Sequence, residues 1–255
     1  MDILRSIAMS FSMFSKLPAP MVEWKKENMK YMLAMLPLVG AVIGGFLWLW
    51  WLICDKCFFD AFIRAAGYTV IPVFISGGIH LDGFCDTVDA LSSHALPEKK
   101  RQILKDPNAG AFAIIYTCVY FFIYYVLCLE ISGTLKAVMA LLAFQMLSRV
   151  LASLSGIFIK AGEKNGLLST FSEASSGTAF IILLVFAAGA FGILFWVSPW
   201  TVLISALMLL LNYLYVLYLA NRQFEGMSGD LAGYINQLAQ ITLLAGLFIA
   251  ERFLI

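Results

Sequence analysis

The chain contains several apolar runs, each long enough to cross a lipid bilayer as a helix. Such a crossing needs about 20 apolar residues, and a helix is favoured because its backbone N–H and C=O groups bond within the segment. Runs bounded by charged or turn residues predict seven spans, near residues 32–54, 61–79, 110–131, 136–159, 177–197, 200–220 and 235–251. The predicted fold is therefore all-α, a polytopic integral membrane helical bundle with the lipid bilayer as its partner.

Composition agrees with this fold class. Hydrophobic residues make up 62% and charged residues 13% of the 255 positions, against roughly 45–50% and 25% in soluble globular chains. The formal net charge is +1, so nucleic acid is not expected as a partner. No internal repeat or low-complexity tail stands out, and residues 1–255 are predicted to form a single membrane domain.

Two segments depart from simple spans. The second span contains Arg64 and Pro72 and ends at Gly77 and Gly78, which leaves a broken or partly re-entrant helix as an alternative. At the N-terminus, apolar residues recur at helical spacing between residues 3 and 14. This pattern predicts a helix that lies in the membrane interface.

The distribution of lysine and arginine predicts the orientation, because cytoplasmic loops carry the excess. Twelve lie on the side of the N-terminus and three on the other: Arg5, Lys16, Lys25, Lys26, Lys30, Lys99, Lys100, Arg101, Lys105, Lys160, Lys164 and Arg222, against Lys56, Lys136 and Arg252. Loops 80–109, 160–176 and 221–234 are therefore expected in the cytoplasm.

The segment Gly77 to Leu91 is the richest in chemistry. Asp82, Asp86 and Asp89 stand at i, i+4 and i+7, so a helix sets their carboxylates on one face. Three like charges repel unless a cation lies among them, and oxygen ligands suit Mg²⁺ or its substitute Mn²⁺. A solvated helix face is the alternative, but the segment is apolar apart from these groups and abuts a span. We therefore favour a metal site.

Neighbouring residues extend this candidate site. Gly77 and Gly78 would let a backbone or ligand approach closely, and His80 could orient a substrate, act as a base or bond an aspartate. Asp106, before a proline, could be a helix cap, a functional carboxylate or both.

A second polar island, residues 226–233, joins the last two spans. Glycines surround Ser228 and Asp230, and Gly226 and Gly229 could help to cradle a phosphate. Arg149 lies inside the fourth span, where a charge is costly unless it is paired. Its expected partner is a phosphate or one of the acids.

Together these residues resemble the cobalamin synthase family, the adenosylcobinamide-GDP ribazoletransferases. Residues 9–20, 77–91 and 226–233 are similar to the family's N-terminal stretch, its G-G-x-H-x-D-G-x-x-D-x-x-D signature and its late glycine-rich turn. Asp106 and Gly110 match a further D-x-x-x-G-x-x-G pattern, but Ala113 replaces its last glycine.

The resemblance implies a Mg²⁺-dependent enzyme of a bacterial or archaeal inner membrane, with its active site facing the cytoplasm. Its substrates would be adenosylcobinamide-GDP and α-ribazole or α-ribazole 5′-phosphate, and its products GMP and adenosylcobalamin or its 5′-phosphate. The metal would be bound by Asp82, Asp86 and Asp89. The catalytic residues would be His80, Asp106 and Asp230. The resemblance leaves open whether the protein forms an oligomer. The substrate would contact Gly77, Gly78, Arg149, Gly226, Ser228 and Gly229.

Two other functions are alternatives. A CDP-alcohol phosphotransferase also uses acids on membrane helices, but Asp86 follows Cys85 where its D-G-x-x-A-R pattern expects arginine. A divalent-cation or solute transporter would place its acids near the bilayer midplane. The acids of this chain instead gather on one side.

Overall fold

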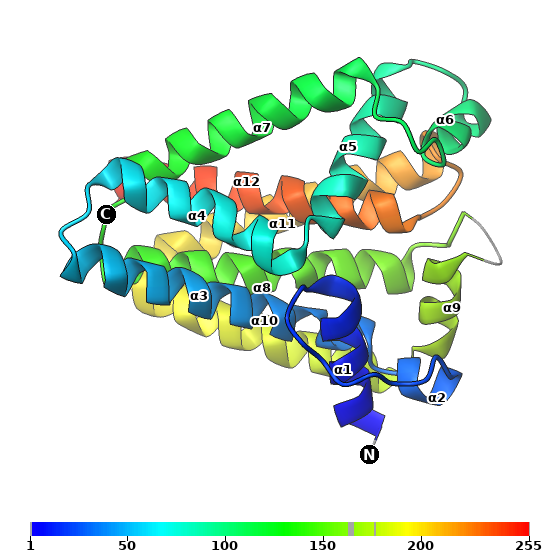
Figure 1. Cartoon of the computed structure of the whole chain (residues 1–255), viewed down its shortest axis with the longest axis horizontal. Coiled ribbons are helices and arrows are strands. Elements are labelled where there is room, and N and C mark those ends of the chain that lie inside the picture. Colours follow the sequence, from blue (N-terminus) through cyan, green and yellow to red (C-terminus); the bar gives the residue numbers. More distant parts are fainter. Residues whose placement is uncertain (1, 163–165, 176, 255) are drawn as a thin grey trace.

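The computed structural model describes residues 2–162, 166–175 and 177–254, and it is a helical bundle (Figure 1). Its elements are α1 (Asp2–Phe14), α2 (Lys26–Met29), the 3-10 helix η1 (Leu33–Met35), α3 (Leu36–Lys56), α4 (Ala61–Ser76), α5 (Ile79–Ser92), α6 (Pro97–Ile103), α7 (Ala111–Glu130), α8 (Leu135–Phe158), α9 (Leu167–Ala174), α10 (Gly177–Val197), α11 (Pro199–Arg222) and α12 (Gly229–Phe253).

Within the described residues, six helices are long and apolar enough to cross a membrane, and α4 with α5 brings the number to seven. The predicted polytopic all-α fold is confirmed. The largest difference in bounds is at α12, which begins at Gly229 rather than near residue 235. Ser228 caps this helix by accepting a hydrogen bond from the Leu231 N–H at 3.1 Å, so its polar first turns are helical although they are not apolar.

The corner between α4 and α5 accounts for two of the predicted site residues. α4 continues through Pro72 and ends at Ser76, before Gly77 and Gly78, whose φ angles of 67° and 79° favour glycine. The chain bends by 96° there. α4 runs beside the other long helices, whereas α5 turns across the end of the bundle (Figure 1). We therefore assign the membrane crossing to α4 and place α5 outside it.

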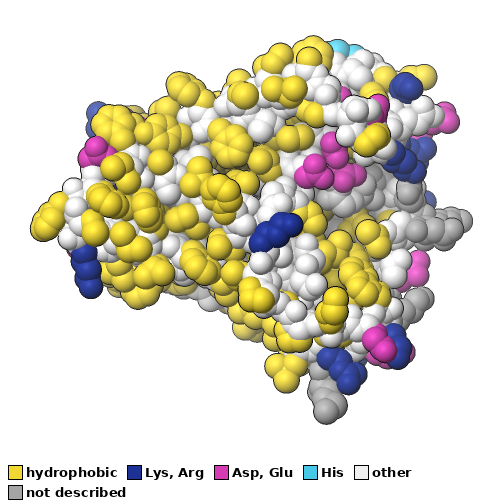
Figure 2. Space-filling model, viewed as in Figure 1, with side chains coloured by type: hydrophobic (Ala, Val, Ile, Leu, Met, Phe, Trp, Pro, Cys, Tyr) yellow, Lys and Arg dark blue, Asp and Glu magenta, His cyan; other side chains and the backbone are white. Residues whose placement is uncertain are grey.

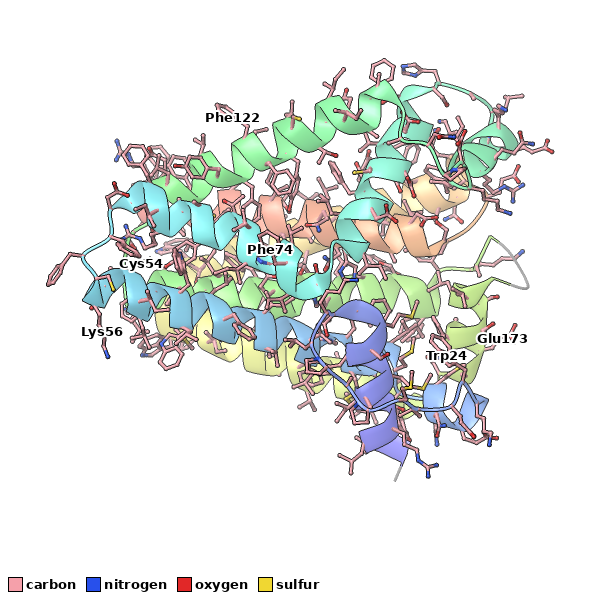
Figure 3. All side chains as sticks on the ribbon, viewed as in Figure 1. Trp24, Cys54, Lys56, Phe74, Phe122 and Glu173 are labelled. Carbon is pink, nitrogen blue, oxygen red and sulfur yellow. The ribbon has the colours of Figure 1, made fainter. Side chains whose placement is uncertain are left out.

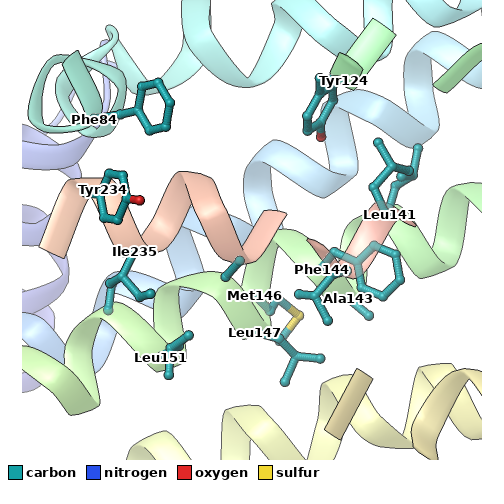
Figure 4. Packing of buried hydrophobic residues seen from close by; sticks show 14 of the residues in the cluster. Phe84, Tyr124, Leu141, Ala143, Phe144, Met146, Leu147, Leu151, Tyr234 and Ile235 are labelled. Carbon is teal, nitrogen blue, oxygen red and sulfur yellow. The ribbon is translucent and has the colours of Figure 1, made fainter. Parts of the chain in front are cut away.

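α8 forms the centre of the bundle and packs against α3, α10 and α12. Its buried face contributes Phe144, Leu147 and Leu151 to the main hydrophobic core (Figure 4). The same helix also buries polar side chains, which bond to one another: Gln145 Nε2 donates to Gln240 Oε1 on α12 at 3.1 Å. This bond satisfies amides that would otherwise be costly in an apolar interior.

Exposed apolar side chains cover the long helices, as expected for a surface in contact with lipid (Figure 2). Phe74 and Phe122 point outward from α4 and α7 (Figure 3). Figure 3 also shows Cys54 and Lys56 at one end of the bundle and Trp24 and Glu173 at the other. The second end carries α5, α6, α9 and the long loops.

α1 lies near this second end and runs across the direction of the long helices (Figure 1). Its serines Ser6 and Ser10 are fully buried, and Ser6 Oγ donates to the Asn28 carbonyl at 2.6 Å. Ile3 and Leu4 are exposed. Met9 and Phe14 of the same helix are also buried, so α1 rests on the bundle through both polar and apolar side chains. Its exposed Ile3 and Leu4 fit the predicted interfacial helix.

Candidate functional site

A cavity of about 360 Å³ opens at the end of the bundle that carries α5 and α6. Two contrasting surfaces line it. We call the first the acidic wall, formed by His80, Asp82, Ser228, Gly229 and Asp230, and the second the apolar wall, formed by Met13, Phe14, Leu33, Leu36, Leu168 and Phe171. A largely apolar cavity with a few convergent polar groups is typical of a small-molecule site.

The acidic wall exists because α5 and the start of α12 touch backbone to backbone. A Cβ atom added to Gly83 would lie 2.7 Å from the Asp230 carbonyl oxygen, and one added to Gly233 would lie 2.9 Å from the His80 carbonyl oxygen. The rings of Phe84 and Tyr234 stack beside this crossing, with centroids 5.6 Å apart (Figure 4). The glycines thus allow two segments far apart in sequence to share one wall.

The aspartates lie close enough to influence one another. Asp82, Asp86 and Asp89 share one face of α5, as predicted. Burial and then the charges of Asp82, Asp230 and Asp89 raise the pKa of Asp86 to about 6. Asp230 therefore belongs to the same group of acids. Figure 2 shows acidic side chains gathered beside a hollow at this end of the molecule.

The members of this group differ in position. Asp82 and Asp230 line the cavity. Asp89 packs against the first residue before α7, where a Cβ on Gly110 would lie 2.1 Å from Asp89 Oδ1. Gly110 in the D-x-x-x-G pattern is therefore explained by the space that the Asp89 carboxylate occupies.

These residues fit a divalent cation in chemistry, though they do not form a closed site. No described lysine or arginine makes an ion pair with Asp82, Asp86 or Asp89. Nor do any three His, Cys, Asp or Glu side chains converge as metal ligands in the described part of the chain. Four mutually repelling carboxylates favour a cation among them. Small side-chain rotations would be needed to bring them onto one ion.

His80 connects the two walls. It is 5% exposed, and its ring stacks on Phe14 with centroids 5.7 Å apart and planes 9° apart. Burial and the nearby Arg149 charge lower the pKa of His80 to about 3. Its Nδ1 atom is buried and has no hydrogen-bond partner among the described residues. The ring is therefore neutral, and its Nδ1 is an unsatisfied polar atom buried beside the cavity.

The glycine-rich turn is held by the segment before α9. The Met227 N–H donates to the Lys160 carbonyl at 2.8 Å, and the Gly162 N–H donates to the Met227 carbonyl at 2.9 Å. Gly226 adopts a φ of 143° and packs directly on Gly162. Gly229, in contrast, has open space where a Cβ would stand. The turn therefore presents the N-terminus of α12 to the cavity.

The described cations that line the cavity come from α6 and the residues just after it, and sequence reasoning singled out none of them. Arg101 and Lys105 line the cavity, and Arg101 Nη2 lies 2.7 Å from Glu225 Oε2. The buried Lys100 donates to Gln223 Oε1 nearby. These two contacts fasten α6 to the turn before α12. The basic run at 99–105 was visible in the sequence, but the positive-inside pattern alone explained it.

Arg149 and Asp106 lie outside the cavity. Arg149 is 1% exposed, and its Nη1 donates to the Gln145 carbonyl and to Gln145 Oε1 at 2.9 and 2.8 Å. Among the described residues no carboxylate pairs with Arg149, so the expected acidic partner is not found. Asp106 is exposed and accepts hydrogen bonds from the backbone N–H and Nδ2 of Asn108, which lower its pKa. It caps this local turn rather than a helix.

Comparison with known proteins identifies the family of the chain. An adenosylcobinamide-GDP ribazoletransferase of Lachnoclostridium phytofermentans is 40% identical, covering 100% of this chain and 97% of that protein. Enzymes with the same name from Clostridium perfringens and Clostridium botulinum strain Alaska E43 are each 30% identical, with at least 93% of both chains covered. No solved structure matches the chain. The family model described as cobalamin-5-phosphate synthase matches residues 6–248. The chain belongs to the cobalamin-5-phosphate synthase family.

Proposed function

We propose that this transferase joins adenosylcobinamide-GDP to α-ribazole, or to α-ribazole 5′-phosphate, and releases GMP. The ribose 3′-hydroxyl oxygen attacks the phosphorus linked to cobinamide, and the bond from that phosphorus to GMP breaks. The product is adenosylcobalamin or its 5′-phosphate. The observation that carries the proposal is the cavity that acids from α5 and α12 share with a cation from α6.

Charge neutralisation is the main demand of such a transfer. Asp82, Asp86 and Asp89, with Asp230, would hold Mg²⁺ or Mn²⁺, which when bound would neutralise the diphosphate. Arg101 is placed to contact phosphate oxygens directly, since Glu225 holds its guanidinium at the cavity. The N-terminus of α12 at Ser228 and Gly229 offers further N–H donors.

Gly77 and Gly78 receive one role and His80 another. Gly77 and Gly78 act by making the corner that turns α5 toward the cavity. His80 orients the attacking hydroxyl rather than removing its proton. A group with a pKa of about 3 is a weak base at neutral pH, whereas a neutral Nδ1 can accept a hydrogen bond.

Asp106 and Arg149 are second-rank candidates because neither lines the cavity. Arg149 would influence the substrate through its charge near His80. Asp106 would shape the turn that precedes α7.

The assay that tests this function is GMP release by purified protein. Adenosylcobinamide-GDP is supplied with α-ribazole or α-ribazole 5′-phosphate, and Mg²⁺ is titrated. We expect release only with both organic substrates and the metal. Divalent-ion uptake by vesicles without GMP release would instead favour a transporter. CMP release from a CDP-alcohol would favour a CDP-alcohol phosphotransferase. The relatives support neither alternative.

We further propose that the cavity faces the cytoplasm of a bacterial or archaeal inner membrane, on the basis of the twelve-to-three lysine and arginine count. A cysteine at Ser93, in a background without native cysteines, should resist an impermeant thiol reagent in intact cells. A cysteine at Phe58, which is 93% exposed in the loop between α3 and α4, should be labelled. The reverse pattern would overturn the orientation.

A further inference from the structure

Most of the apolar wall lies outside the main core, and Leu168 packs against both. Phe14, Leu33, Leu36 and Phe171 belong to a second hydrophobic cluster, to which Leu168 and Met13 add half-buried side chains. The end of α1, the η1–α3 junction and α9 supply these residues. Contact between such an apolar surface and water is unfavourable, so binding of a ligand that covers it with apolar atoms is favoured.

His80 fixes where the polar part of that ligand lies. The Phe14 ring stacks on the His80 ring, so the apolar wall begins directly beside the histidine. His80 is buried and lines the cavity, while its Nδ1 has no partner in the part of the chain that the structure describes. A ligand that satisfies this atom and also covers the wall needs a hydroxyl at one end and an apolar body at the other.

The size of the cavity selects between the two substrates of the proposed function, on which this inference rests. A volume of about 360 Å³ lies near the lower end of the roughly 300–1,000 Å³ typical of small-molecule sites. It suits a nucleoside, whereas a corrinoid macrocycle with its polar amide side chains is larger. We propose that the apolar wall binds the planar aromatic base of α-ribazole, with the ribose at His80.

Leu168→Ser tests this proposal, because Leu168 lines the cavity and is only half-buried. Titration calorimetry on the purified full chain would measure binding of α-ribazole and of a riboside with a polar purine base. We expect the variant to weaken α-ribazole binding about tenfold or more, as for loss of an apolar contact in a specificity pocket. The affinity for the purine riboside should change much less. The KM for adenosylcobinamide-GDP should also change much less.

Two further variants serve as controls. Leu168→Met keeps the volume and apolar character of the side chain and should retain α-ribazole binding. Leu96→Ser changes an exposed leucine at the same end of the molecule but outside the cavity, and should leave binding unchanged. If Leu168→Ser is poorly folded, Met13→Ser at the other side of the wall gives the same comparison.

The outcomes separate this inference from the proposed function. If the parent protein binds α-ribazole and Leu168→Ser weakens that binding, the inference holds even when no GMP is released. Equal binding by parent and variant would overturn it, even in an active enzyme. An increase in KM for adenosylcobinamide-GDP alone would also overturn it, because the wall would then contact the corrinoid substrate.

Discussion

The acidic and apolar walls of the cavity are built in different ways. The acidic wall rests on two helices in backbone contact at Gly83 and Gly233, so the backbone segments that carry its carboxylates are fixed relative to one another. The apolar wall is assembled from helix ends and the short helix α9, which meet through side chains. Charges that neutralise a reacting phosphate need exact placement, whereas an apolar base needs only a surface of matching shape.

The largest expected effect is on the acidic wall. Asp82→Asn keeps the size of the side chain but removes a charge, and should cost about 3–5 kcal/mol of transition-state stabilisation, or roughly a hundredfold to a few thousandfold in rate. The same holds for Asp86→Asn and Asp89→Asn. GMP release at matched expression, with Mg²⁺ and Mn²⁺ titrated, measures it. Asp55→Asn is the control, because Asp55 lies in the last turn of α3, at the end of the helix away from the cavity.

Near-parental rates for all three variants at limiting metal would show that the carboxylates are only a solvated face. In that case the two walls would no longer differ in function. The apolar wall would then be the better guide to the substrate.

Arg101→Gln should have the next largest effect. The substitution removes a charged hydrogen-bond donor from the cavity and breaks the 2.7 Å ion pair with Glu225. Loss of a charge-assisted contact with phosphate should cost about 1.5–3 kcal/mol in kcat/KM for adenosylcobinamide-GDP. Glu225→Gln breaks the same ion pair and leaves the cation in place. If both variants lose equal activity, Arg101 acts by fastening α6 and not by binding phosphate.

Gly83→Ala tests the backbone contact that supports the acidic wall. The added methyl group would lie 2.7 Å from the Asp230 carbonyl, so the two helices must separate. We expect a net loss of about 1–2 kcal/mol in the free energy of unfolding, since overpacking outweighs the better helix propensity of alanine. Thermal unfolding in detergent measures this change. Gly189→Ala on α10, where a Cβ meets open space, should be neutral or slightly stabilising, and equal effects at both sites would contradict the close crossing.

The smallest expected change in stability is at Gly110. An alanine there would displace the Asp89 carboxylate, a movable group, and the φ of −74° suits any residue. The free energy of unfolding should fall by about 0.5 kcal/mol or less, while the Mg²⁺ concentration for half-maximal activity rises up to about tenfold. An unchanged metal requirement would place Asp89 outside the metal site and leave only Asp82 and its neighbours.

Local patterns in the sequence were enough for much of this fold. Apolar runs gave six of the seven spans to within a few residues, because each crossing must satisfy its own backbone bonds. The spacing of Asp82, Asp86 and Asp89 gave their common face, since α5 is a helix. The family resemblance was confirmed by relatives that cover the whole chain. α12 was placed too late because its first turns are polar.

Contacts between distant segments needed the tertiary structure. Only the crossing of α5 and α12 brings Asp230 to the other aspartates, and only the docking of α6 brings Arg101 to the cavity. The tertiary structure also shows that Arg149 bonds to Gln145 and lies outside the cavity. Helix periodicity is a property of neighbouring residues, and it determined which side chains share a face. Which faces meet depends on where glycines let backbones touch, and that is decided only when the whole chain packs.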